Sequence, residues 1–284
     1  MISAPRRPAF SIVLPASNEE SEIGDCLDAL AASDWTDNGF VECIVVANGC
    51  RDRTAEIARD RSAAFAARGW QLQVIEVAQG NKLNALNLGD ATAQAENRAY
   101  IDADVRVSPA LLTQLHAALS TDAPRYASGD CIIETPRSWA SRAYRRIYRQ
   151  VPFMTHGVPG CGVFAVNAAG RSRWTRFPDI ISDDTFVRLS FTPDERVGVP
   201  APYRWPIVEG LKNLVKVRRR QERGVEEIRA KFPELLGNDD KLPFPASQKL
   251  GMALRDPVGF AIYSGVALIV KLTQSGKTNW SRGR

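Results

Sequence analysis

Residues 99–105 read AYIDADV, an apolar run that stops at two aspartates separated by one residue, Asp102 and Asp104. This pattern predicts a buried strand that delivers carboxylates to the edge of a sheet, because a lone buried carboxylate costs several kcal/mol. The two acids therefore need a cationic partner, and a hard divalent ion such as Mg²⁺ or Mn²⁺ prefers carboxylate oxygens. Taken alone, an Asp-x-Asp is more often a strand end followed by a turn. The neighbouring sequence has to separate the two interpretations.

Three more apolar runs precede this one, and each is followed by residues with helical spacing. The predicted strands are residues 10–15 (FSIVLP), 41–47 (VECIVVA), 71–77 and 98–102, and the helices after the first three begin near Asn18, Asp52 and Gly80. The second of these helices is expected to run through Ala67. Strands that alternate with helices predict an α/β fold with a mostly parallel sheet covered on both faces.

The ligand site of such a sheet lies beyond the carboxyl ends of its strands. Those ends carry amides, a lysine and acids: Pro15, Asn18 and Glu19, then Asn48 and Asp52, then Lys82, then Asp102 and Asp104. The first turn, ASNEES, contains no glycine, which excludes a Gly-x-Gly-x-x-Gly dinucleotide site, and no P-loop motif occurs in the sequence. The site therefore suits a nucleotide whose phosphates are neutralised by a metal ion and a lysine.

The composition fits an ordinary globular protein, with 284 residues of which 44% are apolar. The five cysteines are widely spaced and form no Cys-x-x-Cys pair, which predicts reduced thiols. The first ten residues contain no apolar run, so we expect no secretory signal and a cytoplasmic protein. The net charge of +5 is concentrated in residues 203–231, with nine Lys/Arg and four Glu, and 135–152, with five Arg and no acid. These windows predict a face that meets an anionic partner.

The order of these motifs resembles the inverting glycosyltransferases of family 2, which have the GT-A fold, over residues 10 to about 230. SIVLPASNEE resembles the loop that surrounds the nucleobase in that family, VVANGCRDRT resembles the motif after the second strand, and GNKLNALNLG resembles the lysine-bearing segment. The resemblance implies nucleotide contacts for Pro15, Asn18, Glu19, Asn48, Asp52 and Lys82. Asn48 stands where the family often has an acid, and an amide both donates and accepts hydrogen bonds, so the choice of base stays open.

YIDADVRVSP matches the Asp-x-Asp motif of the family. The resemblance implies that Asp104 binds the metal ion directly, whereas Asp102 holds the ribose or a metal-bound water. ISDDTFVRL resembles the family's Glu-Asp motif, whose second acid is the catalytic base, which points to Asp184 with Asp183 beside it. Inversion needs such a base to take the proton of the acceptor hydroxyl. The alternative is that both acids only stabilise the start of a helix.

Two further segments resemble family motifs less closely. PGCGVFAVNAAGR resembles the acceptor-side segment, in which Gly160 and Gly162 would let the backbone approach the sugar, with an ordinary turn as the alternative. His156 lies nearby in the sequence and is a further candidate for contact with the acceptor. VRRRQERG resembles the Gln-x-x-Arg-Trp motif of processive members, which implies that Arg220 and Arg223 bind the diphosphate. Gly224 replaces the tryptophan, and this difference favours transfer of a single sugar.

Two apolar segments are candidates for contact with a membrane. Residues 138–152 predict a basic amphipathic helix, which either packs on the protein core or lies in a membrane interface. Residues 258–270 are apolar except for Ser264 and two glycines, and this run is shorter than the roughly twenty residues of a membrane-spanning helix. It predicts a buried helix or an interfacial anchor, and cations near and beyond its end suit an anionic surface: Lys271, Lys277, Arg282 and Arg284.

The sequence thus predicts a metal-dependent GT-A enzyme that uses Mn²⁺ or Mg²⁺ and moves one sugar from a nucleotide-sugar donor, UDP-linked, to a hydroxyl-bearing acceptor. We expect a catalytic domain at residues 1–230, with a nucleotide-binding half (10–120) and an acceptor half (121–230), and a helical C-terminal extension at 231–284. The alternatives are a sugar nucleotidyltransferase, which would need a glycine- and arginine-rich first loop, and a non-catalytic module that binds nucleotide sugars or a membrane surface. Nucleic-acid binding is disfavoured, because the basic windows lack a recognition motif.

Overall fold

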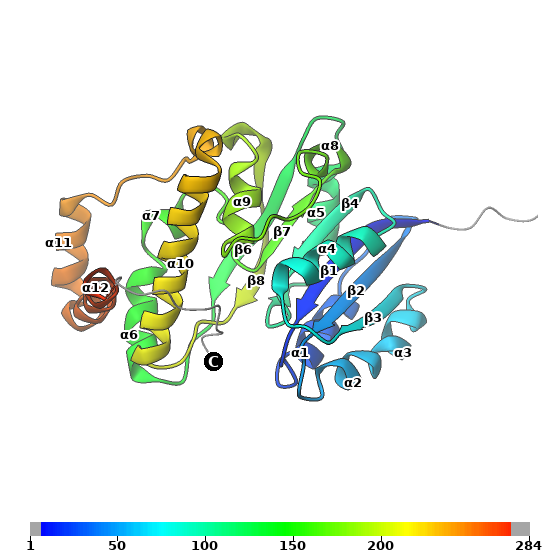
Figure 1. The fold of residues 1–284 in the computed structure, drawn as a ribbon, viewed down its shortest axis with the longest axis horizontal. Helices are drawn as coiled ribbons and strands as arrows, with labels where there is room; N and C mark the ends of the chain where they lie inside the picture. The colour runs from blue at the N-terminus through cyan, green and yellow to red at the C-terminus, as the bar shows by residue number, and fades with distance from the viewer. Residues whose placement is uncertain (1–6, 274–284) are drawn as a thin grey trace, which may run out of the picture. The chain divides into compact units, whose positions relative to one another are not determined.

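The computed structural model describes residues 7–273 and contains an eight-stranded sheet of order β3-β2-β1-β4-β7-β6-β8-β5 (Figure 1). The four predicted strands are confirmed as β1 (Pro8–Ala16), β2 (Phe40–Asn48), β3 (Gln71–Val77) and β4 (Asn97–Ile101). β1 pairs in parallel with both β2 and β4, and β2 pairs in parallel with β3. The predicted parallel arrangement therefore holds for this half of the sheet.

Beyond β4 the sheet becomes antiparallel. β7 (Val163–Val166) runs antiparallel to β4, and β6 (Tyr126–Ile133) runs antiparallel to β7. The short strand β5 (Arg106–Val107) pairs antiparallel with β8 (Arg196–Trp205) at the far edge. These strands come from the part of the sequence that follows the Asp-x-Asp motif.

The helices that connect the first strands are α1 (Ile23–Ala31), α2 (Thr54–Arg59), α3 (Ser62–Ala67), α4 (Lys82–Thr92) and α5 (Leu111–Leu119). The prediction of a single helix from Asp52 through Ala67 is wrong in one respect, because the structure has two helices there, α2 and α3. The backbone N–H of Arg61 bonds the carbonyl of Ala58 at 3.2 Å, a three-residue spacing that tightens the chain and interrupts the α-helical pattern.

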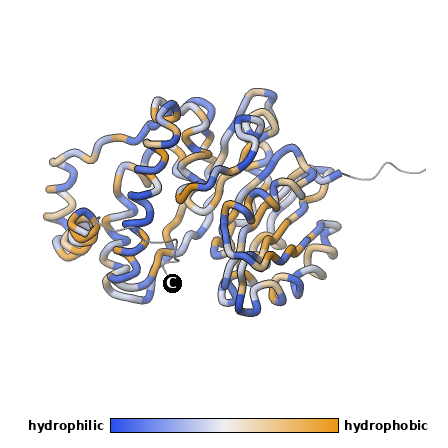
Figure 2. Tube along the Cα trace, in the orientation of Figure 1, coloured by the Kyte–Doolittle hydropathy of each residue, from blue (hydrophilic) through white to orange (hydrophobic). Residues whose placement is uncertain are grey.

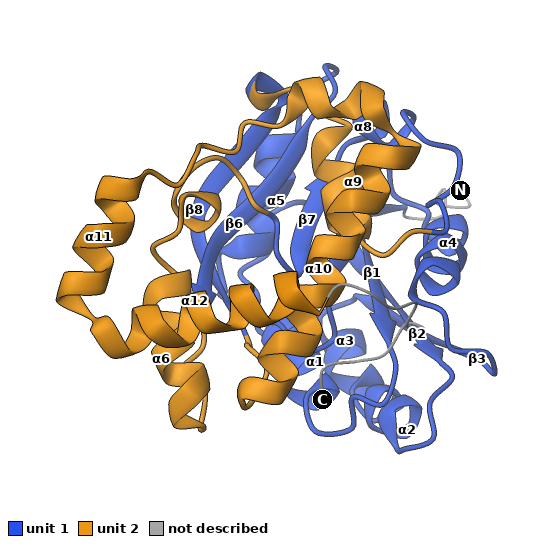
Figure 3. Cartoon of the chain, turned by 60° about the vertical axis from the view of Figure 1, so that its left-hand side comes forward, with its two compact units in different colours: residues 1–132, 160–179, 194–205 blue, residues 133–159, 180–193, 206–284 orange. Residues whose placement is uncertain are grey.

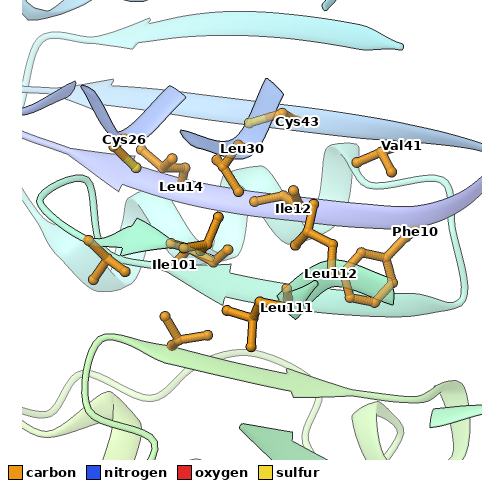
Figure 4. Packing of buried hydrophobic residues seen from close by; sticks show 14 of the residues in the cluster. Phe10, Ile12, Leu14, Cys26, Leu30, Val41, Cys43, Ile101, Leu111 and Leu112 are labelled. Atoms are coloured by element: carbon orange, nitrogen blue, oxygen red, sulfur yellow. The ribbon is translucent and has the colours of Figure 1, made fainter. Parts of the chain in front are cut away.

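The core lies on both faces of the sheet because alternate residues of a strand point to opposite sides. On one face Phe10, Ile12 and Leu14 pack in a buried cluster with Leu27 and Leu30 of α1 (Figure 4). On the other face Ile44 and Val46 cluster with Ala85 of α4. A Cβ placed on Gly89 of α4 would lie 2.5 Å from Val13 Cγ1, so α4 contacts β1 closely enough to exclude a side chain there. The prediction of helices on both faces is confirmed.

The chain forms two compact units, which we call unit 1 (residues 1–132, 160–179 and 194–205) and unit 2 (133–159, 180–193 and 206–284) (Figure 3). Residues 121–230, predicted as one acceptor half, contribute to both. Unit 1 also includes α8 (Ala168–Arg171). The helices of unit 2 are α6 (Trp139–Tyr148), α7 (Pro152–Thr155), α9 (Asp183–Leu189), α10 (Leu211–Lys231), α11 (Ala246–Arg255) and α12 (Pro257–Leu272). Two short 3₁₀ helices span Pro193–Glu195 and Pro233–Asn238.

The C-terminal run predicted as a helix is confirmed as α12. Across residues 7–273, none of the helices combines the length and the apolar character that crossing a bilayer requires. Lys277, Arg282 and Arg284, which the sequence suggested as contacts to an anionic surface, lie outside the described residues.

Candidate active site

The candidate site of unit 1 begins where the strand order reverses. The chain proceeds from β1 to β2 and β3 on one side and then returns to place β4 on the other side of β1. In open parallel sheets the loops on either side of such a reversal diverge and leave room for a ligand. Asp102 is the first residue after β4. The fold therefore brings the first predicted acid to the position where a ligand is expected.

The turn at residues 102–105 is held by its backbone. The N–H of Asp102 donates to the carbonyl of Gly162 at 2.9 Å, and the carbonyl of Asp102 accepts from the N–H of Val105 at 3.1 Å. Ala103 and Val105 are buried, whereas Asp102 and Asp104 are half-buried. The turn thus buries its apolar residues and leaves its two aspartates partly exposed, with one oxygen of Asp104 buried.

Lys82 provides the cation that the acids at the strand end need. Its ammonium lies 3.0 Å from Asp102 Oδ1, and both side chains are about one-third exposed, 27% and 35%. Lys82 is the first residue of α4, whose N-cap Asn81 accepts a hydrogen bond from the N–H of Asn84 at 3.0 Å. The cap fixes where the helix begins, and with it the lysine. Because the pair is partly solvated, a ligand phosphate can compete for the lysine at modest cost.

The two aspartates fit a divalent cation bound jointly with a ligand. Within the described part of the chain there is no group of three or more His, Cys, Asp or Glu side chains that could hold a metal ion. Mg²⁺ is usually held by one or two carboxylates together with substrate phosphates and waters, and seldom by an all-protein cage. Asp102 and Asp104 therefore suit a metal ion that arrives with a diphosphate.

The loop after β1 is positioned by the loop after β2. Asn18 has a φ of 53°, in the left-handed region that asparagine tolerates better than most residues. Its Oδ1 accepts a hydrogen bond from the N–H of Arg51 at 2.8 Å. The N–H of the buried Glu19 donates to Thr54 Oγ1 at 2.7 Å. Pro15 is buried near the end of β1, opposite Val46. The predicted nucleobase loop is therefore ordered by contacts within unit 1.

Asn48 links the ends of β1 and β2 to the start of α4. Its Nδ2 donates to the carbonyl of Ala16 at 2.8 Å, and its Oδ1 accepts from the N–H of Asn81 at 3.1 Å. The side chain is only 3% exposed. The amide therefore ties β1 and β2 to the start of α4, and its predicted contact with a nucleobase stays a prediction.

Asp52 is held as a carboxylate by the turn that precedes α2. Burial of this group opposes ionisation, but hydrogen bonds from Thr54 and from the N–H of Glu20 outweigh it and lower the pKa of Asp52. Thr54 contributes both its Oγ1, at 2.5 Å, and its N–H, at 3.1 Å. Thr54 joins Asp52 to Glu19, a role that the sequence did not reveal although the threonine is part of the quoted motif.

Gly160 and Gly162 require glycine on steric grounds. Their φ values are 66° and 72°, and a Cβ on Gly160 would lie 1.8 Å from the hydroxyl of Tyr126. A Cβ on Gly162 would lie 2.9 Å from the indole of Trp205. The glycines thus place the carbonyl of residue 162 against the Asp102 turn, and their contact with an acceptor stays a prediction.

Asp183 and Asp184 are the first two residues of α9 in unit 2, as predicted. Asp183 is buried, whereas Asp184 is half-buried and its Oδ1 accepts from the N–H of Thr185 at 2.7 Å. An acid in the first turn of a helix is stabilised by the helix dipole. The accessible one of the two is the residue that the family motif assigns as base.

Helix α10 holds the segment that leads into α9. Glu227 Oε2 accepts from the N–H of Ile181 at 2.7 Å, and a Cβ placed on Gly224 would lie 2.0 Å from Ser182 Oγ. In the sequence, Glu227 and Lys231 have the i,i+4 spacing of a helical ion pair, which suggests only a surface role for the acid. The structure contains this ion pair, with 2.7 Å between Lys231 Nζ and Glu227 Oε1. The contact of Glu227 with the α9 segment was therefore missed.

Three residues of unit 2 were predicted to contact a ligand, and the geometry of the unit does not assign them that role. Arg220 and Arg223 are half-buried on α10, and His156 is exposed with its Nδ1 2.9 Å from Thr155 Oγ1. Their roles toward diphosphate and acceptor stay predictions.

Comparison with solved structures assigns the fold. A mannosyltransferase of Pyrobaculum calidifontis, PcManGT, determined with GDP-Man and Mn²⁺, matches with a TM-score of 0.59 at 19% identity, over 96% of this chain and 77% of that one. Glucosyl-3-phosphoglycerate synthase of Mycobacterium tuberculosis, with Mn²⁺ and UDP, matches with a TM-score of 0.54 at 20% identity, over 82% of this chain and 81% of that one. The fold is therefore the GT-A type, a mostly parallel sheet flanked by helices, with additional C-terminal helices.

Sequence comparison identifies the family. The model of glycosyl transferase family 2 matches residues 11–173, more than half of the chain, and the protein belongs to that family. The glycosyltransferase EpsJ of Bacillus subtilis, itself described as uncharacterized, is 34% identical over 108 residues, which are 38% of this chain and 29% of EpsJ. The matched region thus spans less than a third of this curated relative.

Proposed function

We propose that this protein is a metal-dependent, inverting glycosyltransferase that moves a single sugar from a nucleotide-sugar donor, UDP-linked, to a hydroxyl acceptor. The observation that carries this proposal is the pair formed by Lys82 and Asp102 at the reversal of strand order, with Asp104 two residues further on. A lysine and two partly exposed carboxylates complement a diphosphate with its divalent cation. The solved relatives described with GDP-Man or UDP and Mn²⁺ support the same ligand class.

In this proposal the residues of the chain bind and orient the donor and its cation, and they deprotonate the acceptor hydroxyl. Asp102 and Asp104 hold the cation, Lys82 contacts the diphosphate, and the loops around Asn18 and Asp52 surround the base and ribose. When bound, the metal ion stabilises the negative charge that the departing diphosphate gains. Asp184 accepts the proton of the acceptor hydroxyl, and Arg220 and Arg223 assist at the diphosphate.

The first test is a thermal-shift measurement with UDP, GDP and their sugar conjugates, with and without Mn²⁺. A ligand that binds only the folded state at a hundred times its Kd stabilises it by about 2.7 kcal/mol. We expect UDP-linked donors to raise the Tm by several degrees, and only when Mn²⁺ is present. Shifts with GDP donors alone would overturn the choice of UDP, and the lack of any metal-dependent shift would overturn the proposed function.

Lys82→Met should weaken donor binding about tenfold, because hydrogen bonds to charged groups contribute about 1.5–3 kcal/mol. The substitution removes the cation and also leaves Asp102 to repel the diphosphate. Titration calorimetry with UDP and Mn²⁺ measures the change in Kd. Lys212→Met, at an exposed lysine on the first turn of α10, is the matched control and should bind UDP like the wild type. An unchanged Kd in Lys82→Met would remove the lysine from the site.

We also propose that the protein works at an anionic membrane surface. Helix α6 carries three arginines and no acid, which agrees with the basic window found in the sequence. Apart from Trp139, the apolar side chains of α6 are buried in the fold, so its arginines would contribute mainly attraction to anionic headgroups and little apolar insertion would accompany them. The acceptor would then be met at that surface.

A further inference from the structure

Helix α12 is apolar on two opposite faces, which is unusual for a helix at the surface of a protein. Its inner face packs against α6 within unit 2. A Cβ on the buried Gly259 would lie 3.0 Å from the carbonyl of Ala143, and the rings of Tyr263 and Tyr144 have centroids 5.2 Å apart. Val266 and Val270 are fully buried. One apolar face of the helix is therefore used by the fold itself.

The opposite face of α12 is exposed and equally apolar. Val258, Leu268 and Leu272 are each more than half exposed, with Leu272 at 73%. Together with Ala261 and Gly265 they follow spacings of three and four residues, which place them on one stripe along four turns. In Figure 2, where α12 is seen nearly end-on, much of its trace is coloured as hydrophobic. A packed fold would ordinarily place polar residues on this stripe.

Helix α11 carries further exposed apolar side chains. It packs against α12, and its Leu250 and Leu254, one helical turn apart, are 61% and 76% exposed. We call the exposed residues Leu250, Leu254, Val258, Leu268 and Leu272 the C-terminal apolar face. Five aliphatic side chains on two adjacent helices exceed the single exposed hydrophobics that are normal on a soluble surface.

The charges on these two helices are almost all positive. Between residues 246 and 273 the cations are Lys249, Arg255 and Lys271, all exposed, and the acid is Asp256. Asp256 pairs with Arg146 of α6 at 2.6 Å, and the hydrogen bonds from Arg146 lower the pKa of Asp256. Asp256 also accepts from the N–H of Gly259 at 2.9 Å and so caps α12. The acid is therefore used to fix α12 on α6, and the cations stay available to a partner.

We propose that the C-terminal apolar face docks into the interface of an anionic lipid bilayer, with Lys249, Arg255 and Lys271 at the level of the headgroups. The aliphatic side chains bury apolar area among the acyl chains, and the cations meet phosphate groups. A second copy of the chain fits less well, because a two-fold interface sets the same patch against itself and would bring like charges together. The inference rests on the proposed association with anionic lipid and is independent of sugar transfer.

The test is co-flotation of the full-length protein with vesicles of phosphatidylcholine, with and without phosphatidylglycerol. The wild type should float with the anionic vesicles and far less with the neutral ones. Leu254→Glu combined with Leu272→Glu should reduce the bound fraction at least tenfold, because both changes place a carboxylate on the docking face. Lys249→Gln, Arg255→Gln and Lys271→Gln should each weaken binding to anionic vesicles about fivefold. Leu211→Glu, at an exposed leucine of α10, is the matched control and should float like the wild type.

Sedimentation equilibrium and donor hydrolysis separate this inference from its rivals. A wild type that does not float, or double-glutamate and control variants that float alike, would overturn the docking proposal. A wild type that dimerises through this face, with the double variant monomeric and no flotation in either, would assign the face to a second copy and overturn it as well. Hydrolysis of the donor by the double variant should stay at the wild-type rate, so that failure of docking and failure of the transferase proposal give different results.

Discussion

Asp184→Asn should lower kcat by about 10²–10⁴-fold, the usual contribution of a general base. The amide keeps the size of the side chain and its place in the first turn of α9 but cannot accept the acceptor proton at neutral pH. Because Asp184 is assigned no contact with the donor, the Kd for UDP with Mn²⁺ should remain within about twofold, well under the tenfold that 1.4 kcal/mol represents. The expected change is therefore confined to the chemical step.

Steady-state kinetics with a donor and acceptor found by screening measures kcat, and calorimetry measures the Kd for UDP. Asp130→Asn, at an exposed aspartate of β6, is the control for the chemical change and should be fully active. A fall in kcat for Asp183→Asn but not for Asp184→Asn would transfer the role to the buried acid. Wild-type kcat in both variants would exclude this acid pair as the base.

The parallel half of the fold could be predicted because its signals are local. The strands β1 and β2 are largely apolar, β3 and β4 mix apolar with polar residues, and each strand is followed within a few residues by its polar strand-end motif. The pairing of Lys82 with Asp102 follows from this order, since strand ends that are distant in sequence meet at one edge of a parallel sheet. The antiparallel half gave no such signal, because β5 has two residues and β7 four, which are too few for a periodic pattern in the sequence.

Side-chain roles were harder to predict than strands. The sequence marks Asn48 as a residue for a ligand, but it cannot show that the amide is 3% exposed and bonded to Ala16 and Asn81. The same limit applies to Gly224, which the sequence shows only as the residue that replaces the tryptophan of the Gln-x-x-Arg-Trp motif. The structure gives the glycine a role of its own, because the space that a side chain would need is occupied by Ser182. Such roles depend on contacts between segments that are 32 to 42 residues apart.

Gly224→Trp, which would restore the tryptophan of the processive members, should destabilise the protein by about 3 kcal/mol, the upper part of the usual range for overpacking. A Cβ at this position lies 2.0 Å from Ser182 Oγ and 2.9 Å from Ser182 Cβ, so α10 and the start of α9 would have to separate. Helix propensity alone predicts that replacing this glycine stabilises the protein, since glycine in a helix interior is about 1 kcal/mol less favourable than alanine. Movement of the α9 segment would also displace Asp183 and Asp184, and kcat should fall with the stability.

The cause can be isolated with Gly224→Ala and Ser182→Gly in a double-mutant cycle measured by urea unfolding. Ser182 is the N-cap of α9, but its side chain makes no capping hydrogen bond to the described residues, and glycine is tolerated at that position. Ser182→Gly alone should therefore cost only a few tenths of a kcal/mol, and it removes both atoms that a Cβ at position 224 would meet within 3 Å. The double variant should be more stable than Gly224→Ala, with a coupling energy of about 1–2 kcal/mol. Gly251→Ala in α11, where no described heavy atom lies within 4 Å of the added Cβ, should instead stabilise the protein. If Gly224→Ala is as stabilising as Gly251→Ala, the glycine is not needed for close packing of α10 on the segment that carries Asp184.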